Sequence, residues 1–166
     1  VLLYELYPKR DLSFLAVLLA MLIGGTVANV VSQILFDVFP LENKWLAAVL
    51  TGFFEELPKA AATLAVLIVA KNRSPLAGFV FGAAVGCGFS IVEDMGYIFV
   101  SANELSSLNL TTVIEIAFSR GATAFCTHIL WTGAVGWAFN ISKRMLANFV
   151  VYPVILLSCS LHIVWD

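Results

Sequence analysis

Charge is scarce in this sequence. Only 12% of its 166 residues are Asp, Glu, Lys or Arg, which is about half the share found in soluble domains. Hydrophobic residues make up 61%, and the mean hydropathy is +0.96. A soluble domain of this composition would have too few polar groups to cover its surface, and a disordered chain would be far less hydrophobic. The net charge of -2 also lacks the basic surface that nucleic acids require, so we expect no nucleic-acid partner.

Cysteine is rare as well. Cys87, Cys126 and Cys159 are the only three, and each lies inside an apolar stretch. None has the Cys-x-x-Cys spacing of a metal site, and their number is odd. We interpret them as free thiols that pack against lipid or against other helices. Cys159 precedes His162 by three residues, which leaves a cysteine nucleophile as an alternative.

Five long apolar segments fill most of the chain, and short breaks rich in turn-forming and charged residues separate them. The segments are approximately Leu12–Phe39, Trp45–Ala70, Pro75–Ser101, Thr112–Phe139 and Asn148–Asp166. A helix of about 20 apolar residues crosses a bilayer. The sequence therefore predicts an all-α, polytopic transmembrane helix bundle of about five spans, with residues 1–166 forming a single domain in the lipid bilayer. Because the sequence has no initial Met and stops within or just after the fifth segment, we expect the natural ends, including the C-terminus, to be missing.

The basic residues between the segments predict the orientation of the chain. They lie before the first segment, between the second and third, and between the fourth and fifth: Lys9, Arg10, Lys71, Arg73, Lys143 and Arg144. The other two connections carry only Lys44 beside Glu42, and Glu104. Since Lys and Arg accumulate in cytoplasmic loops, we expect the N-terminus in the cytoplasm. The connections near Leu41 and Leu105 should then lie outside.

Ionisable residues nevertheless occur inside the apolar segments. They are Glu55, Glu56, Lys59, Glu93, Asp94, His128, His162 and Asp166. A single charge at the bilayer centre costs about 2.5–3.5 kcal/mol on insertion scales. Such groups persist where they face one another or a water-filled cavity. Their number therefore predicts a functional cluster in preference to isolated structural ion pairs.

The spacing of these residues places them on common helix faces. Glu55 and Lys59 are four residues apart, as are His162 and Asp166, so each pair shares one face of its helix. With a rise of about 1.5 Å per residue, four side chains reach similar depths in the middle to outer half of the membrane. We expect these four to converge in one polar pocket: Glu55, Glu93, His128 and His162.

Other polar residues have supporting or peripheral positions. We expect Asp94 to pair with Lys59 or Arg120, and Arg120 to reach the mouth of the pocket. Glu115 lies near the outer end of the fourth segment, where its side chain can extend to the interface. The first segment has no ionisable group in its interior, so we expect it to pack peripherally or to act as a gate on the substrate side.

Carboxylates and imidazoles in one wet pocket can activate water. A glutamate takes the proton from water, and a histidine positions the water or protonates a leaving amine, while a second His or Asp stabilises the oxyanion. Histidine and glutamate also form the ligand sets of catalytic zinc. If the site is metal-dependent, we expect the ligands to be Glu55, Glu93, His128 and His162. We favour a site without a cofactor, because the vicinal Glu55 and Glu56 beside Lys59 are more typical of a charge-tuned base than of a ligand set.

The sequence lacks the signatures of several known classes of intramembrane protease. The sequence has no His-Glu-x-x-His of a zinc protease, no Gly-x-Gly-Asp of an aspartyl protease and no Gly-x-Ser-x-Gly serine elbow. The alternative from another class is a proton-coupled membrane transporter or channel that uses the same Glu/His cluster as a proton relay. Broken helices or inverted repeats would favour transport, and the sequence indicates neither. A membrane scaffold without enzymatic activity would not need the cluster.

Four motifs, in order along essentially the whole chain, resemble those of the PrsW family of intramembrane proteases. Phe54–Lys59 (FEELPK) resembles its Glu-Glu-x-x-Lys motif, and Phe89–Glu93 (FSIVE) resembles its Phe-x-x-x-Glu motif. Arg120 followed by His128–Thr132 (HILWT) resembles its third motif. His162–Asp166 (HIVWD) resembles its last, His-x-x-x-Asp. The family is similar to the CAAX prenyl proteases and to bacteriocin-processing proteins.

This resemblance implies a membrane-embedded peptidase in a bacterial or archaeal cell membrane, from a family described both as metal-dependent and as glutamate-type; we favour the glutamate type. Its catalytic residues would be Glu55, Glu56, Glu93, His128 and His162, with support from Lys59, Asp94, Arg120 and Asp166. Glu55 would be the general base, and His162 and Asp166 would flank the oxyanion. Glu93 stands where the related families have a histidine. The implied reaction is site-1 cleavage, on the outer side, of a single-span membrane-bound anti-sigma factor.

Overall fold

The computed structural model describes residues 12–39, 42–104, 109–141, 145–147 and 149–165. These residues form helices and connecting turns, with no strand among them. The helices are α2 (Phe14–Leu19), α3 (Gly25–Val38), α4 (Lys44–Ala70), α5 (Pro75–Glu104), α6 (Leu110–Ala124), α7 (Leu130–Asn140) and α8 (Val151–Trp165). Single π-helical turns, Ala20–Gly24 and Phe125–Ile129, join α2 to α3 and α6 to α7. The predicted all-α bundle is confirmed, and the five apolar segments match the helices to within a few residues.

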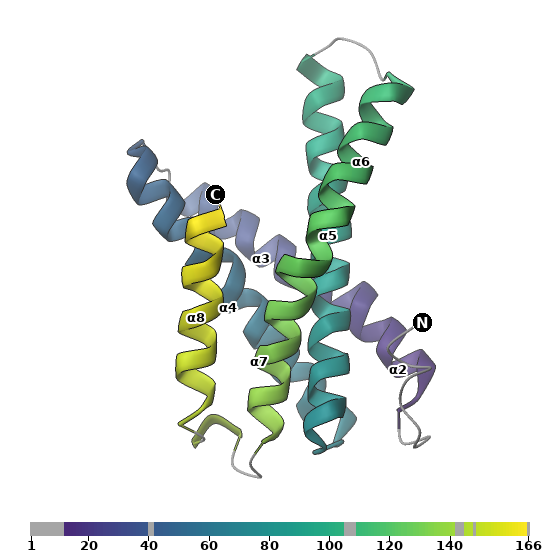
Figure 1. Ribbon diagram of the computed structural model, residues 1–166, viewed down its shortest axis with the longest axis vertical. Coiled ribbons are helices and arrows are strands. Elements are labelled where there is room, and N and C mark those ends of the chain that lie inside the picture. The colour runs from purple at the N-terminus through teal and green to yellow at the C-terminus, as the bar shows by residue number, and fades with distance from the viewer. Residues whose placement is uncertain (1–11, 40–41, 105–108, 142–144, 148, 166) are drawn as a thin grey trace.

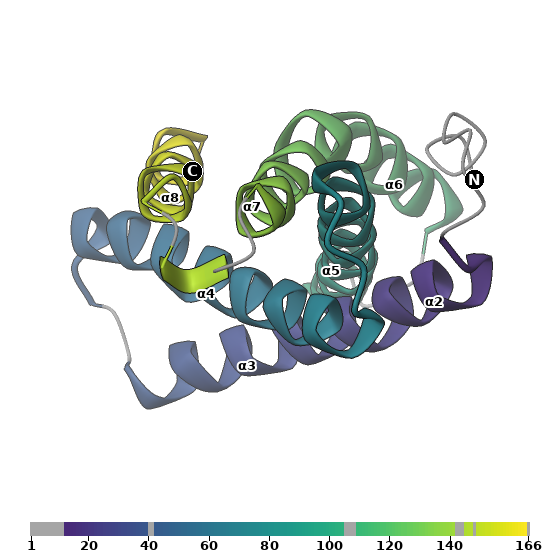
Figure 2. The same ribbon diagram turned by 90° about the horizontal axis from the view of Figure 1, so that it is seen from below.

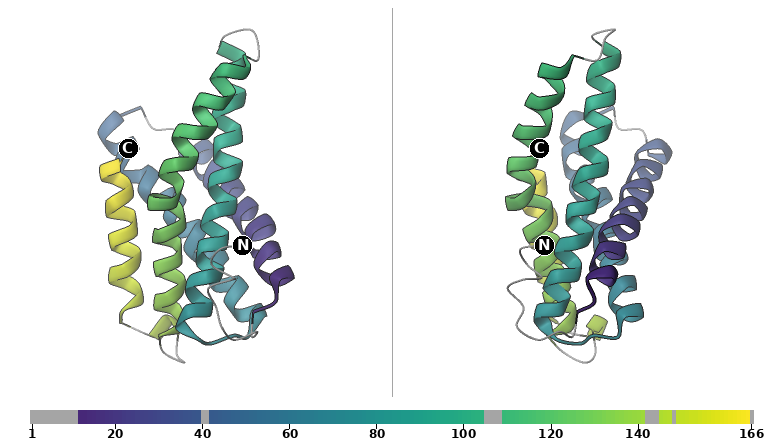
Figure 3. Two further views of the ribbon diagram at one scale, coloured as in Figure 1. Left: turned by 45° about the vertical axis from the view of Figure 1, so that its right-hand side comes forward. Right: turned by 90° about the vertical axis from the view of Figure 1, so that its right-hand side faces the viewer.

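Helix α4 packs between two sides of the bundle. Figure 2 shows it between the α2–α3 helix on one side and α7 and α8 on the other, and it contacts α3, α5, α7 and α8. In Figure 1, α4, α5, α6–α7 and α8 run alternately down and up, so successive connections lie at opposite ends. The upper parts of α5 and α6 project beyond the other helices (Figure 3). Residues in the middle of α4 therefore have neighbours from most of the chain.

A proline inside α4 explains how α3 docks there. Pro58 has no N–H, so the carbonyl of Phe54, four residues earlier, receives no helical hydrogen bond from it. Ser32 on α3 donates its hydroxyl to this carbonyl at 2.8 Å. A carbonyl that α4 leaves unpaired and a buried hydroxyl of α3 are thus satisfied together. Because Phe54 precedes Glu55, this bond holds α3 beside the first of the buried carboxylates.

Glycine lets α5 approach α7 and the π-helical turn before it. Gly82 and Gly86 are four residues apart on one face of α5. A β-carbon at Gly82 would overlap the carbonyl oxygen of Thr132, and one at Gly86 would overlap that of His128. Small residues bring membrane helices into this kind of close contact. The contact at Gly86 fixes the backbone that carries His128.

Two of the described helices are long and apolar enough to cross a bilayer, namely the continuous helix Phe14–Val38 and the Pro75–Ser101 part of α5. The apolar helix α8 is shorter. Helix α4 has sufficient length, but Glu55, Glu56 and Lys59 lie in its middle. The helix that contributes most charge to the interior is therefore one that a hydropathy criterion does not select.

Candidate active site

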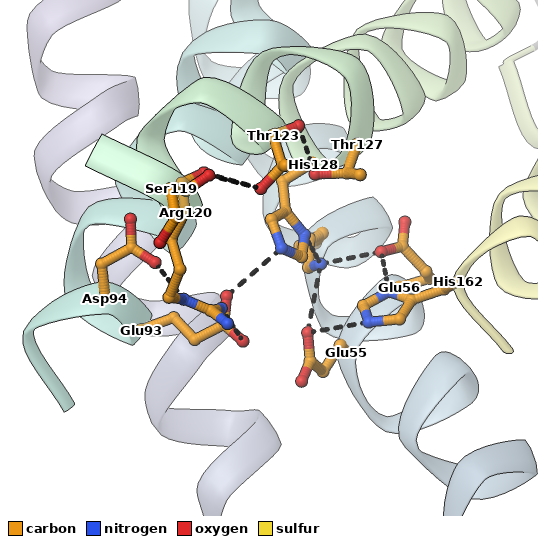
Figure 4. Close-up of polar contacts among 11 residues, drawn as sticks. Glu55, Glu56, Glu93, Asp94, Ser119, Arg120, Thr123, Thr127, His128 and His162 are labelled. Carbon is orange, nitrogen blue, oxygen red and sulfur yellow. Dashed lines mark hydrogen bonds and ion pairs between the residues drawn. The ribbon is translucent and has the colours of Figure 1, made fainter. Parts of the chain in front are cut away.

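Ionisable side chains from four parts of the chain meet inside the bundle. Glu55, Glu56 and Lys59 come from α4, Glu93 from α5, His128 from the π-helical turn Phe125–Ile129, and His162 from α8 (Figure 4). All are buried except Glu93, which is partly buried. The helix spacing and the similar depths predict the convergence of four of them, namely Glu55, Glu93, His128 and His162. We call these six residues the carboxylate–histidine cluster.

Lys59 lies at the centre of the cluster, and its side chain is fully buried. Its Nζ is 2.7 Å from Glu56 Oε1 and 3.4 Å from Glu55 Oε2. It is also 2.8 Å from Nδ1 of His128 and lies 3.9 Å above the centre of the Phe89 ring. A lysine ammonium has three donors and no acceptor, so Nδ1 of His128 accepts. In the neutral imidazole the other nitrogen, Nε2, then carries the proton.

Both carboxylate oxygens of Glu56 are occupied. Oε1 accepts from Lys59 and, at 2.8 Å, from Nδ1 of His162. Oε2 accepts from the hydroxyl of Ser158 on α8. With three donors around it and only 2% of its side chain exposed, Glu56 is a fixed anion. It sets the orientation of the His162 ring and keeps the proton of that ring on Nδ1.

Glu55 has different surroundings, although it is the preceding residue. Its Oε2 lies 3.5 Å from Nε2 of His162 and 3.4 Å from Lys59 Nζ. It also lines a cavity of about 700 Å³ between α3, α4 and α5, which Glu93 lines from α5. Glu55 is therefore a buried carboxylate that combines contact with a histidine and access to a space large enough for a bound molecule.

Glu93 is held between a histidine and an arginine. Its Oε2 lies 3.2 Å from Nε2 of His128, and its Oε1 lies 3.0 Å from Nη2 of Arg120 on α6. Arg120 also contacts Asp94 at 2.6 Å and stacks on the ring of Tyr97 at 3.7 Å. Of the two partners predicted for Asp94, the structure gives Arg120; the pairing with Lys59 is not formed among the described residues, because Lys59 is turned into the cluster.

Glu115 is exposed on α6, apart from the cluster, and the extension of its side chain to the membrane interface stays a prediction. Asp166 lies outside the described residues, so its place beside the oxyanion stays a prediction.

The comparisons with known proteins place the chain in a family. The model of the PrsW family of intramembrane metalloproteases matches residues 8–166. The chain belongs to this family. The resemblance of the four motifs is thereby confirmed, and membership makes this PrsW-family chain an integral membrane peptidase whose substrate is a membrane protein. No curated protein and no solved structure matches the chain.

The family description as metalloproteases raises the question of whether the cluster suits a metal ion. Glu55, His128 and His162 each offer a ligand atom, and these atoms lie within 4.8 Å of one another. Bonds of about 2.0–2.1 Å place tetrahedral ligand atoms about 3.3 Å apart. The 3.5 Å between Glu55 Oε2 and His162 Nε2 is close to that spacing. Glu56 behind His162 corresponds to the carboxylate that commonly orients a histidine ligand. The donor set fits a divalent ion such as zinc.

Lys59 would compete with a metal ion for His128, one of these three ligands. Because it donates to Nδ1 of His128, Nε2 of that ring carries a proton and offers no lone pair. The protonated Nε2 faces Glu93 at 3.2 Å. With its proton on Nε2, His128 offers no free ligand atom, and binding an ion through it would require Lys59 to give up its contact with Nδ1.

Several neighbours of the cluster are not apparent from the sequence. Ser158 lies four residues before His162, and this spacing is a usable signal that it shares the same helix face. The Trp131 ring lies 5.7 Å from that of His162 and forms an apolar wall. Asn29 and Gln33 of α3 line the cavity beside Glu55. The first segment, for which the sequence predicts peripheral packing or a gate on the substrate side, thus contributes two amides to the cavity wall. Because these amides are uncharged, the sequence does not reveal this contribution.

Proposed function

We propose that this PrsW-family chain is an intramembrane endopeptidase that hydrolyses a peptide bond of a single-span membrane protein with water activated by Glu55. The position of Glu55 carries the proposal: it is a buried carboxylate that lines the cavity and lies 3.5 Å from His162. Amide hydrolysis needs a base for water and an acid for the leaving nitrogen, and these two groups provide both. We also propose that residues 1–166 act as one protease domain around this site.

In the proposed reaction Glu55 takes a proton from a water molecule as the water oxygen attacks the substrate carbonyl carbon. Nε2 of His162 lies beside Glu55, and Glu56 holds the opposite nitrogen. Nε2 can therefore receive the proton and deliver it to the amide nitrogen. The C–N bond breaks as that nitrogen is protonated, which gives a new carboxyl end and a new amine. Glu56 acts through His162 and is a positioning residue.

The oxyanion that forms on the carbonyl needs a donor, and His128 is suited to be one. Its Nε2–H faces Glu93 at the cavity, and the ammonium of Lys59 lies behind the ring. A pre-positioned N–H with a positive charge behind it stabilises developing negative charge. By family resemblance, His162 and Asp166 would flank the same oxygen. Arg120 holds Glu93 in place through its other oxygen.

For the hydrolytic water we propose glutamate-type activation without a metal, because the contact of Lys59 leaves His128 a donor instead of a ligand. The metal-dependent alternative is favoured by the three clustered ligand atoms and by the family description. In that case Glu55, His128 and His162 would hold the ion. A bound ion would polarise the carbonyl and make its water more acidic.

For the substrate and the orientation we propose what the family resemblance and the loop charges imply. The substrate would be an anti-sigma factor, cut on the outer side of a bacterial or archaeal membrane, and the N-terminus would be cytoplasmic. Single cysteines introduced at Lys71 or Ser74 should react only with reagents that enter the cytoplasm. Cysteines introduced at Thr111 should react from outside. The reverse pattern would place the site in the inner half of the membrane.

Reconstitution of the purified chain in liposomes with single-span proteins tests the proposed activity. We expect two products, with a mass-spectrometric cut within or next to the span. The Glu55→Gln chain, checked for folding, should yield neither product. A wild-type chain that leaves every substrate intact but carries protons across the vesicle membrane, with Glu55→Gln abolishing that flux, would replace the peptidase by the transporter alternative.

A further inference from the structure

The cavity beside the carboxylate–histidine cluster has a wall of uncharged polar groups. Besides Glu55 and Glu93, its lining includes Asn29 and Gln33 from α3 and Thr51 from α4. The carboxylates accept hydrogen bonds when ionised and donate none. The side-chain amides of α3 and the hydroxyl of Thr51 are therefore neutral donors that line this cavity.

Asn29, one of the residues that line this wall, has an unused donor that lies buried behind the cavity surface. The residue is only 6% exposed, and its Nδ2 is buried without a hydrogen-bond partner among the residues that the structure describes. Buried amide groups are nearly always paired, because an unmade hydrogen bond is unfavourable in an apolar interior. An unpaired, buried amide in a residue that lines a cavity indicates a donor that would pair with a bound group.

Packing fixes the position of Asn29 on both sides. Four residues before it, a β-carbon at Gly25 would overlap the backbone of Gly88 and Phe89, so α3 and α5 touch there. Three residues after it, Ser32 donates to the carbonyl of Phe54 on α4. Gly25, Asn29 and Ser32 share one face of α3. The amide is thus held between the turn of α5 that leads to Glu93 and the turn of α4 that carries Glu55.

We propose that Asn29 is a substrate-binding residue whose side chain turns toward the cavity so that Nδ2 donates to a backbone carbonyl of the unwound substrate segment. The inference rests on the proposed peptidase function and adds to it the group that recognises the peptide backbone. A transmembrane helix must unwind before a peptide bond can reach Glu55, and each unwound carbonyl then needs a donor that lipid does not supply. The cavity volume of about 700 Å³ accommodates a short stretch of extended chain. Gln33, one turn further along α3, continues the same wall.

Kinetics in proteoliposomes test the proposal through Asn29→Leu, which keeps the shape and removes the donor. We expect KM, measured as substrate mole fraction, to rise about 10-fold with kcat changed less than about threefold, since the lost bond is made in the ground state and the transition state alike. The midpoint of unfolding should stay equal or rise, because an unpaired buried amide is removed. The matched control is Thr26→Val on the exposed face of α3, which should leave KM unchanged.

A binding measurement keeps this test separate from that of the peptidase itself. A photo-crosslinking residue at Gln33 in the Glu55→Gln chain should capture a single-span substrate, and Asn29→Leu should reduce the yield about 10-fold. If the wild-type chain cleaves nothing, the proposed function fails while this yield still tests Asn29. An unchanged KM and crosslinking yield in Asn29→Leu, or a fall in the unfolding midpoint without a change in KM, would overturn the proposal and make Asn29 a structural residue.

Discussion

The Nζ of Lys59 lies 2.8 Å from Nδ1 of His128, a residue 69 positions later in the chain, and both side chains are more than nine-tenths buried. This contact links α4 to the π-helical turn before α7. It determines which nitrogen of His128 carries a proton, and so whether the ring donates or ligates. The same ammonium neutralises Glu56 at 2.7 Å, so one lysine controls both the charge and the hydrogen-bond pattern of the cluster.

Removal of this ammonium should destabilise the chain. Lys59→Met keeps the stem and leaves Glu56 as a buried anion without its cation, a change that costs about 3–5 kcal/mol for buried pairs. We expect the midpoint of unfolding in detergent to fall markedly. The double variant Lys59→Met, Glu56→Gln removes the charge of both partners and should recover much of the loss. Equal stability of the wild-type and Lys59→Met chains would contradict the central position that we give to Lys59.

The close contact at Gly86 provides a test of how His128 is positioned. Gly86→Ala places a methyl group against the carbonyl oxygen of His128, so we expect it to cost about 1–3 kcal/mol and to displace the ring. Gly121→Ala on α6, where no described atom lies within 4 Å of the added carbon, is the matched control. It should keep full activity and gain helix propensity, which differs by about 0.8–1.0 kcal/mol between the two residues. Comparable activity and stability of the two variants would show that α5 does not fix His128.

Much of the fold and of the cluster could be predicted because charged side chains are energetically unfavourable in a membrane interior. The breaks between segments are visible from Pro, Asn, Lys and Arg, and the helices follow them closely. Glu55, Glu93, His128 and His162 are recognisable because ionisable groups at matched depths have to meet. The same argument predicts a cationic partner for Asp94, but it leaves Lys59 and Arg120 as equal choices, and only the structure gives Arg120.

Features that depend on contacts between distant uncharged groups could not be predicted. The bond between Ser32 and the Phe54 carbonyl requires α3 to cross α4 at the turn that Pro58 weakens, and a serine in an apolar helix gives no sign of its partner. Asn29 belongs to the same class. The difference between Glu55 and Glu56 also depends on packing, since Ser158 of α8 reaches only Glu56, and Nδ1 of His162 lies closer to Glu56 than its Nε2 lies to Glu55.

Chelation and elemental analysis of the purified chain test whether the hydrolysis requires a bound metal ion. If Glu55 activates water without a metal, exhaustive chelation should leave cleavage of a single-span substrate intact. Elemental analysis of the active chain should then find well under one bound ion per chain. One tightly held zinc ion per chain, lost together with activity and restored with it, would establish the metal-dependent alternative and require Lys59 to release His128.

Cleavage of a single-span substrate by carboxylate variants tests most directly whether Glu55 and Glu93 form the active site. Glu55→Gln keeps shape and removes the base, so turnover should fall by about 10²–10⁴-fold with little change in unfolding. Glu115→Gln, on the exposed face of α6, should cleave at the wild-type rate. Because Glu55 and Glu93 act in one site, their combined loss should be less than the product of the single losses. Near-normal cleavage by a well-folded Glu55→Gln, Glu93→Gln chain would contradict the assignment of the active site.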